Sequence, residues 1–221
     1  MVPRRRGSGR ATCPANATLP QSFPSPGNFG LKSNYCARRP TLLTFAKSLN
    51  MHTVTGATGL LGAHLVARLR LDNQPVRVLY RRPERLALLD KVLAYAGLDP
   101  QQERKQIELR ALDLLDYPAL EEALSGTQQL FHCAALVSFD PRDKGRLLED
   151  NPKMTSQVVD AALRQKVKHL VYVSSVAALG RKPGQNDFDE NNHWIESRHN
   201  TAYAKSKYRA ELEVWRGIGE G

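Results

Sequence analysis

The chain has 221 residues, an apolar fraction of 41% and a formal net charge of +10. This length holds one domain of ordinary size, and no apolar run approaches the roughly 18 residues that cross a bilayer. Three widely spaced cysteines match no disulfide or metal-ligand pattern, so we expect a reducing compartment and no bound metal.

The positive charge is concentrated near the N-terminus. Residues 1–50 contain eight of the 32 Lys and Arg residues and no Asp or Glu. The remainder, residues 51–221, therefore carries 24 basic against 22 acidic side chains and is nearly neutral. Because nucleic-acid binding needs a basic footprint on the folded surface, we expect neither a nucleic acid nor a membrane as a partner.

Residues 1–50 also hold six of the 13 prolines and show no sustained periodicity, which predicts a disordered segment. Its arginines and lack of acidic residues are typical of an organellar transit peptide. The favoured alternative is an upstream extension of a protein that starts at Met51, directly before the first predicted strand. A cytoplasmic location follows from the second interpretation and an organellar one from the first.

From Met51 onward, short apolar runs alternate with longer segments of helical period. Strands are predicted at 52–55, 76–80, 107–112, 129–133 and 169–174. Helices are predicted at 60–71, 84–95, 117–124, 146–165 and 201–216. The finer expectations are an apolar stripe in the first helix (Leu61, Leu65, Leu69), an N-cap at Asp116, and a break or first turn at Pro152.

This alternation predicts an α/β fold, a doubly wound parallel sheet of the Rossmann type over residues 51–221. Five strands are present before the chain stops at Gly221, where such a sheet normally continues. We therefore expect that the C-terminal strands and a substrate domain are missing and that this domain is incomplete.

A glycine-rich turn follows the first predicted strand, in the sequence Thr55-Gly-Ala-Thr-Gly-Leu-Leu-Gly62. Gly56 would let the chain reverse tightly, Gly59 would let backbone approach a pyrophosphate, and Gly62 would let the helix pack closely on the strand. The helix N-terminus then presents its amides to phosphates. The turn therefore predicts a dinucleotide site.

The end of the second predicted strand bears on the choice of cofactor. NAD enzymes usually place an Asp or Glu there to bind the ribose 2′-hydroxyl. This chain has Arg81 and Arg82 instead. A guanidinium pairs well with a 2′-phosphate, so Arg81 favours NADP, with NAD as the alternative.

Tyr203 and Lys207 lie four residues apart in a predicted helix, so they share one helix face. A nearby ammonium favours the phenolate form of tyrosine, which prepares the phenol for proton transfer. Ser175, at the carboxyl end of a predicted strand, would hold a carbonyl oxygen beside Tyr203, with Ser174 as the alternative. Together these residues predict catalytic proton transfer.

These motifs resemble the extended short-chain dehydrogenase/reductases, also described as the NAD-dependent epimerase/dehydratase family. The resemblance runs from Met51 to Gly221 and rests on four segments in the family's order: Thr55–Gly62, Phe131–Ala135, Ser174–Ser175 and Tyr203–Lys207. Leu179-Gly180 after the serines is similar to the dihydroflavonol-reductase-like branch. The nucleotide-sugar epimerases usually have an aromatic residue before that glycine.

The resemblance implies further roles. Asp113 would contact adenine with Leu114 beside it, and Ala134 and Ala135 would run beneath the cofactor. Asn151 would hold a proton-relay water, although Pro152 and Met154 depart from the family pattern at this point. Lys207 would also bind the ribose hydroxyls. The complete expected cofactor set is Thr55, Gly56, Thr58, Gly59, Leu60, Leu61, Gly62, Arg81, Asp113, Leu114, Ala134, Ala135, Tyr203 and Lys207; the catalytic set is Ser175, Tyr203, Lys207 and Asn151.

The sequence therefore predicts an NAD(P)-dependent oxidoreductase that transfers hydride between the cofactor and a small carbonyl or alcohol substrate. A nucleotide-sugar epimerase or dehydratase is the second hypothesis. A non-catalytic module that senses NADP(H) is the third, because an incomplete chain can bind cofactor without turnover. The substrate and the oligomeric state stay open.

Overall fold

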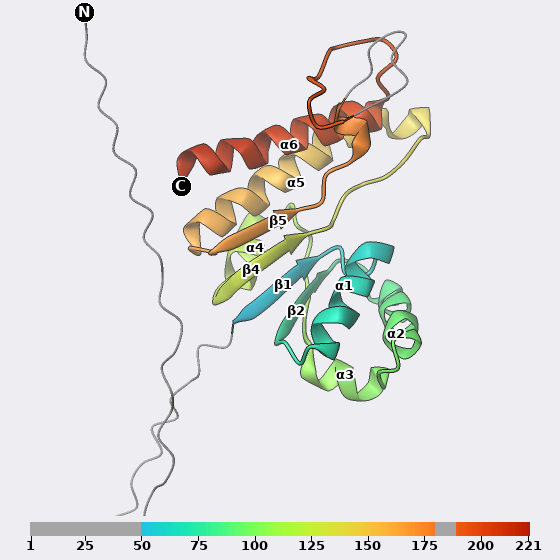
Figure 1. Cartoon of the computed structure of the whole chain (residues 1–221), viewed down its shortest axis with the longest axis vertical. Helices are drawn as coiled ribbons and strands as arrows, with labels where there is room; N and C mark the ends of the chain where they lie inside the picture. The colour runs from blue at the N-terminus through green and yellow to red at the C-terminus, as the bar shows by residue number, and fades with distance from the viewer. Residues whose placement is uncertain (1–49, 180–188) are drawn as a thin grey trace, which may run out of the picture. The chain divides into compact units, whose positions relative to one another are not determined.

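A computed structural model of the chain describes residues 50–179 and 189–221, and it contains a five-stranded parallel sheet (Figure 1). The predicted leader, Cys13, Cys36 and Gly180 lie outside the described residues. The strands, in the spatial order β3-β2-β1-β4-β5, are β1 (Met51–Thr55), β2 (Val76–Tyr80), β3 (Glu108–Ala111), β4 (Thr127–His132) and β5 (His169–Tyr172).

The strand order reverses beside β1. The chain builds outward from β1 through β2 to β3 and then returns to place β4 on the other side of β1. Ligands of doubly wound sheets bind in the crevice at the carboxyl ends of the strands next to such a reversal. The predicted Rossmann-type architecture is confirmed, and it places the ends of β1 and β4 at the centre of the candidate site.

Six α-helices are seen in the described part of the chain, and five of them match predicted segments. They are α1 (Leu60–Leu71), α2 (Leu86–Tyr95), α3 (Pro100–Gln106), α4 (Tyr117–Ala123), α5 (Lys144–Arg164) and α6 (Ala202–Glu220). The Asp116 carboxylate caps α4 by accepting from the Ala119 amide, as expected. The helix α3 was not predicted, although Asp99 caps it and Pro100 opens it, which is a standard start signal.

The expected break at Pro152 is absent, because α5 continues through it from Lys144 to Arg164. A proline inside a helix removes one backbone hydrogen bond. Here α5 buries side chains such as Leu147 and Val158 against the rest of the domain, and α6 lies alongside it (Figure 1). Tertiary packing therefore outweighs the local cost.

The apolar core lies on both faces of the sheet. One cluster joins β1 and β2 to α1 and α2, and the other joins β2 and β4 to α4 and α5. The predicted stripe of α1 is confirmed in part: Leu65 and Leu69 are partly buried against the core, but Leu61 is 55% exposed, and the fully buried face contains Ala63, Val66 and Ala67. Gly62, at the start of α1, packs directly on the glycine turn.

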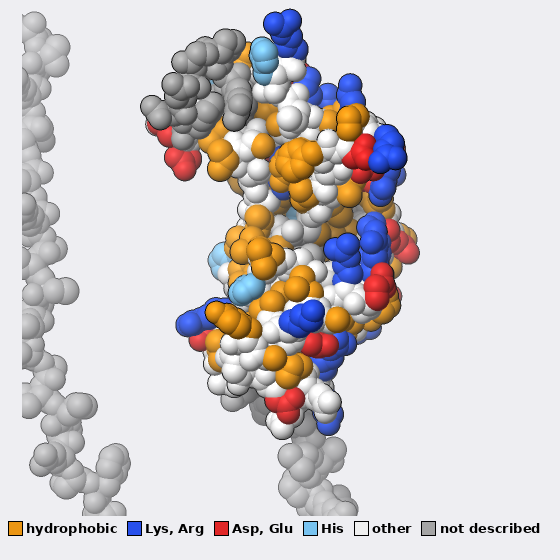
Figure 2. Space-filling view, turned by 90° about the vertical axis from the view of Figure 1, so that its right-hand side faces the viewer, with side chains coloured by type: hydrophobic (Ala, Val, Ile, Leu, Met, Phe, Trp, Pro, Cys, Tyr) orange, Lys and Arg blue, Asp and Glu red, His pale blue; other side chains and the backbone are white. Residues whose placement is uncertain are grey.

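None of the helices in residues 50–179 and 189–221 is both long and apolar enough to cross a membrane. Within these same residues, no group of three His, Cys, Asp or Glu side chains is arranged to hold a metal ion. Cys133 is a half-buried free thiol whose pKa is raised by burial. On the face shown in Figure 2, basic, acidic and apolar side chains are interspersed.

Candidate functional site

The glycine turn between β1 and α1 leaves no room for side chains at two of its positions. Gly56 has a φ of +68°, and a Cβ there would lie 2.6 Å from the Ala134 nitrogen and 2.7 Å from the Cys133 carbonyl carbon. A Cβ at Gly62 would lie 2.8 Å from Cα of Ala57. Gly62 thus packs against the turn itself, whereas we had expected it to pack against the strand. The turn and the end of β4 are therefore in backbone contact.

The N-terminus of α1 is open toward an anion. Its N-cap residue is Gly59, no side chain caps it, and its first turn contains no acidic residue. A Cβ on Gly59 would meet one neighbouring atom, the Gly56 carbonyl oxygen at 3.3 Å. The first amides of a helix lack intrahelical acceptors and carry the positive end of the helix dipole. This end of α1 is therefore suited to bind phosphate.

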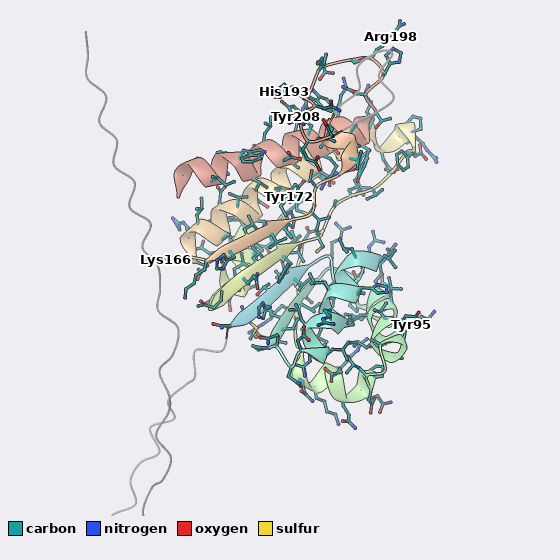
Figure 3. All side chains as sticks on the ribbon, in the orientation of Figure 1. Tyr95, Lys166, Tyr172, His193, Arg198 and Tyr208 are labelled. Carbon is teal, nitrogen blue, oxygen red and sulfur yellow. The ribbon has the colours of Figure 1, made fainter. Side chains whose placement is uncertain are left out.

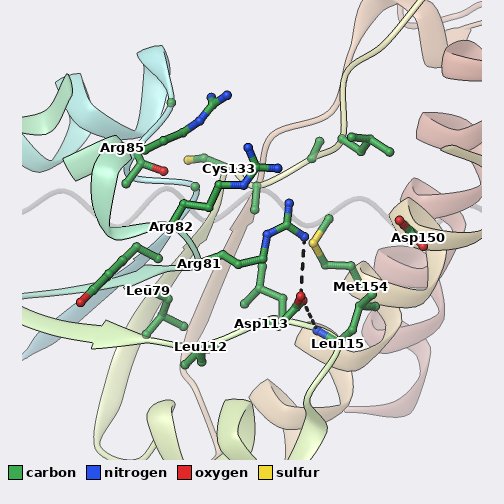
Figure 4. A pocket seen from close by; sticks show the side chains of 18 of the residues that line it. Leu79, Arg81, Arg82, Arg85, Leu112, Asp113, Leu115, Cys133, Asp150 and Met154 are labelled. Atoms are coloured by element: carbon green, nitrogen blue, oxygen red, sulfur yellow. Dashed lines mark hydrogen bonds and ion pairs between the residues drawn. The ribbon is translucent and has the colours of Figure 1, made fainter. Parts of the chain in front are cut away.

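A cavity of about 430 Å³ lies in front of this turn (Figure 4). The structure brings eight of the expected cofactor residues to its wall: Gly56, Thr58, Gly59, Arg81, Asp113, Leu114, Ala134 and Ala135. The other six do not line it: Thr55, Leu60, Leu61, Gly62, Tyr203 and Lys207. Of these six, Thr55 is a buried strand residue and Gly62 supports the turn.

Arg81 and Asp113, for which the sequence predicted separate roles, form an ion pair across the cavity wall. Their closest nitrogen and oxygen atoms are 3.6 Å apart, and both side chains are about half exposed. Asp113 also accepts a hydrogen bond of 3.0 Å from the Leu115 amide, so its carboxylate is fixed (Figure 4). Arg82 and Arg85 line the same cavity. The region therefore offers several cations to a bound ligand.

Sequence reasoning missed the contribution of α5 to this cavity. Arg146, Asp150 and Met154 line it from successive turns of the helix. Arg146 and Asp150 form an ion pair of 3.7 Å. Their spacing of four residues is the signal that a helix face points to one place. Met154, a departure from the family pattern, thus contributes to the cavity wall.

A second missed residue is His132, at the end of β4. Its Nδ1 lies 2.8 Å from the Thr55 hydroxyl and its Nε2 lies 3.2 Å from the Thr155 hydroxyl. The Ala134 amide donates to the same Thr55 oxygen at 3.2 Å. Burial, and secondarily the charge of Lys207, lowers the pKa of His132 to about 3. A neutral imidazole therefore joins β1, β4 and α5 behind the cavity.

Asn151 makes three hydrogen bonds in a buried junction. Its Oδ1 accepts from the Leu136 amide at 2.7 Å, and its Nδ2 donates to the Leu136 carbonyl at 2.9 Å and to the Ser206 hydroxyl at 3.0 Å. The residue is 1% exposed. These contacts bind the segment that leaves β4 to both long helices. The expected proton-relay water stays a prediction.

Lys207 points from α6 to the end of β5. Its Nζ donates to the Val173 carbonyl at 2.8 Å and lies 4.4 Å from the ring centroid of Tyr172. Burial lowers its pKa to about 8, while the charge of Glu211 acts in the opposite direction. Figure 3 shows Tyr172 between β5 and the long helices. The lysine is thus a buried cation that is still mostly protonated at neutral pH.

Tyr203 lies one helical turn before Lys207, at the start of α6, where Thr201 caps the helix. It lines a second cavity, of about 540 Å³, together with Phe139, whose ring centroid is 5.7 Å from that of Tyr203. Ser138 and Phe139 follow directly on the segment that lines the first cavity. The two cavities therefore flank one stretch of chain after β4.

The two candidate serines after β5 have different partners. The Ser174 hydroxyl donates to the Glu211 carboxylate. The Ser175 hydroxyl accepts from the Ala177 amide at 3.2 Å, which leaves its proton for another acceptor. Neither serine lines the two cavities, so the expected contact of Ser175 with a ligand stays a prediction.

Comparison with known proteins shows which family and which relatives the chain resembles. Residues 52–218 match the model of the NAD dependent epimerase/dehydratase family. The chain is 34% identical over 171 residues to sterol demethylase protein B of Methylococcus capsulatus, covering 75% of this chain and 47% of that protein. It is 33% identical over 171 residues to a putative dihydroflavonol 4-reductase of Synechocystis, covering 76% and 45%.

Among solved structures, a short-chain dehydrogenase/reductase superfamily protein from Agrobacterium tumefaciens with bound NAD superposes with a TM-score of 0.58. It is 26% identical, and the match covers 74% of this chain and 44% of that one. The chain thus spans about half the length of the relatives it matches. The predicted resemblance is confirmed by the family match and by a relative named as a dihydroflavonol reductase.

Proposed function

The chain belongs to the NAD-dependent epimerase/dehydratase family, and from this premise we propose that it is an oxidoreductase that acts on a carbonyl–alcohol pair. The observation that carries the proposal is the arrangement at the carboxyl edge of the sheet. There the glycine turn faces one cavity, and Tyr203 lines the next cavity one turn from the buried Lys207. Residues 51–221 would form the cofactor-binding domain.

The first cavity fits a nicotinamide dinucleotide. The positions at which a Cβ would collide belong to the turn that approaches phosphate in such folds, and α1 presents an uncapped N-terminus beside it. Gly59, Ala134 and Ala135 offer a wall of small residues. When bound, the nicotinamide would supply or accept the hydride. In this proposal Thr58 and the amides of Leu60 and Leu61 bind the phosphates.

Residues of the chain itself would transfer the proton to and from the substrate oxygen. Ser175 would donate a hydrogen bond to the substrate oxygen, and Tyr203 would give its phenolic proton to that oxygen during reduction. Free tyrosine titrates near 10, and the Lys207 ammonium would stabilise the resulting phenolate. Lys207 would also bind the ribose hydroxyls. Asn151 would act through the segment that it holds at Leu136 and, with a bound water, in proton relay.

We further propose NADP as the preferred cofactor, with NAD as the alternative. Arg81, Arg82 and Arg85 line the cavity at the end of β2, where an NAD enzyme usually has a carboxylate. Asp113 orients Arg81 by its ion pair. Together with Leu114, Asp113 would also contact the adenine. The substrate would be a small carbonyl or alcohol compound that enters from the cavity of Tyr203.

The test compares two tyrosines of the same helix. Tyr203→Phe should reduce the turnover of NADPH with a broad carbonyl panel by about 10²- to 10⁴-fold and leave the binding of NADPH, measured by its fluorescence, unchanged. Tyr208→Phe is the matched control, because Tyr208 stacks on Trp194 with ring centroids 4.3 Å apart. Full activity of the Tyr203 variant would overturn the mechanism.

The alternatives have distinct outcomes in the same experiment. A nucleotide-sugar epimerase would retain cofactor through purification and interconvert sugar nucleotides without net oxidation of NADPH. A module that senses NADP(H) would bind the cofactor but turn over no carbonyl compound and no sugar nucleotide. Either outcome would replace the oxidoreductase assignment.

A further inference from the structure

Four polar or aromatic residues form a ladder along α6. Tyr203, Lys207, Glu211 and Trp215 are each four residues apart, so successive members are neighbours on the helix surface, in a stripe that turns from the buried Lys207 to the exposed Trp215. The first two belong to the proposed catalytic group. Glu211 has no role in that proposal, yet its carboxylate accepts from the Ser174 hydroxyl and from the Trp215 indole nitrogen, the latter at 3.4 Å.

Glu211 and Lys207 hold consecutive residues of the segment that leaves β5. Lys207 binds the Val173 carbonyl at 2.8 Å, and Glu211 binds the side chain of Ser174. The next residue is Ser175. Two successive turns of α6 therefore clamp the two residues that precede the proposed catalytic serine.

From these contacts we propose that Glu211 is a positioning residue for the Ser175–Tyr203–Lys207 group. It fixes Ser174, and through it Ser175, against α6, and its negative charge stabilises the Lys207 ammonium. The inference rests on the proposed function for its catalytic meaning. The clamp and the charge coupling are properties of the folded chain that can be measured without turnover.

The charge coupling has a defined sign. Around Lys207 the titratable groups are His132 on β4, Tyr172 on β5, and Tyr203 and Glu211 on α6, while α5 contributes the uncharged Asn151 and Thr155. Burial lowers the pKa of Lys207 to about 8, and Glu211 raises it. Removal of the carboxylate charge must therefore lower the pKa further.

The decisive measurement is an NMR titration of Lys207 in this chain, followed by its ¹³Cε resonance and assigned with a Lys207→Arg variant. Glu211→Gln should move the midpoint to lower pH by about 0.5–1 pH unit. Glu213→Gln is the matched control, because it removes the same charge from the same helix but from a residue paired with Arg216. Equal midpoints in the parent chain and the Glu211 variant would overturn the charge coupling.

The clamp is tested by amide hydrogen exchange at Val173, Ser174 and Ser175. Ser174→Ala and Glu211→Ala should each speed exchange there by about tenfold, as expected for loss of one hydrogen bond to a charged group. Ser174→Ala should leave the midpoint of Lys207 nearly unchanged. Unaltered exchange in both variants would overturn the clamp.

Activity assays then separate this inference from the proposed function. In Glu211→Gln the alkaline decline of kcat should begin at lower pH, because Lys207 loses its proton earlier. Ser174→Ala should lower kcat without displacing that decline. If the parent chain turns over no substrate while the NMR and exchange results hold, the proposed function fails and the role of Glu211 in the fold stands.

Discussion

Around β1 and α1 the candidate site is made of backbone, whereas around β5 and α6 it is made of side chains. Gly56 and Gly62 shape the first region because a Cβ at either position would overlap neighbouring main chain. In the second region, Lys207 and Ser174 are held by hydrogen bonds between α6 and the end of β5. In the sheet β1 is the middle strand and β5 an edge strand, with β4 between them (Figure 1).

This difference determines which kinds of change each region is sensitive to. A backbone site is insensitive to pH but fails when one methyl group is added. A side-chain site tolerates small changes of volume but responds to pH and to the loss of a polar partner, because buried polar groups must stay paired. His132 and Asn151 lie at the boundary between the two regions. His132 ends β4 and contacts Thr55 of β1, and Asn151 binds Leu136, just after β4.

The largest effect is expected where the backbone region is filled. Gly56→Ala adds a Cβ 2.6 Å from the Ala134 nitrogen in a left-handed conformation, which should cost about 2–5 kcal/mol of stability and abolish NADPH binding. Gly97→Ala is the control, because Gly97 also has a positive φ but has open space around it. It should cost about 1 kcal/mol. Denaturant unfolding measures both, and equal losses would refute the collision.

The next effect is expected at the junction between the regions. Asn151→Ala leaves the Leu136 amide and carbonyl without their partners, which should lower the free energy of unfolding by about 3 kcal/mol. Ser206→Ala removes one of the three hydrogen bonds of Asn151 and should cost about 1 kcal/mol. If the serine variant lost as much stability as the asparagine variant, the three contacts would not be the source of the effect.

In the side-chain region, we expect the free energy of unfolding to decrease at acidic pH. The pKa of His132 is about 3 in the folded chain and about 6.5 when unfolded. The unfolded state therefore binds more protons below pH 6.5, and stability falls as the pH falls from 6.5 toward 3, by about 1.4 kcal/mol per pH unit.

A variant without this titration sharpens the test. His132→Gln keeps polar atoms near Thr55 and Thr155 but removes the ionisable group. It should be less stable than the parent at pH 7. Between pH 6.5 and 5 its stability should fall by about 1.6 kcal/mol less than that of the parent. Parallel declines in urea unfolding would show that His132 does not control acid stability.

The backbone region was largely predictable from sequence, and the side-chain region was not. The glycines at positions 56, 59 and 62 are a direct sequence signal, because few other residues permit such a turn. The bounds of α1 and β2 match the predicted 60–71 and 76–80. In contrast, Asn151, His132 and Glu211 each have a partner that is distant in the sequence, at 15, 77 and 37 residues respectively. Local spacing carries no information on such pairs.

Two local errors have the same origin. The stripe Leu61, Leu65 and Leu69 follows helical period, yet the face of α1 that packing buries most deeply carries Ala63, Val66 and Ala67, and Leu61 is exposed. Pro152 is normally a helix breaker, yet the packing of α5 overrides it. The link of Arg81 to Asp113 was also hidden, because each residue was interpreted alone.

The smallest effect is expected at this last pair, which lies on the exposed rim of the backbone region. Arg81→Asp should weaken NADPH binding by about tenfold, the scale of one exposed charge-assisted contact, and should leave NADH binding nearly unchanged. Arg82→Asp is the control for a general loss of positive charge, because Arg82 lines the same cavity.

A third variant isolates the ion pair. Asp113→Asn removes the carboxylate that lies 3.6 Å from Arg81. If Asp113 contacts the adenine, this variant should weaken the binding of both NADPH and NADH. Fluorescence titrations with NADPH and NADH give the ratio of the two dissociation constants for each variant. If Arg81→Asp and Arg82→Asp changed that ratio equally, the 2′-phosphate preference would belong to the electrostatic field of the whole rim. The backbone region would then select its cofactor by charge density, without a specific side-chain contact.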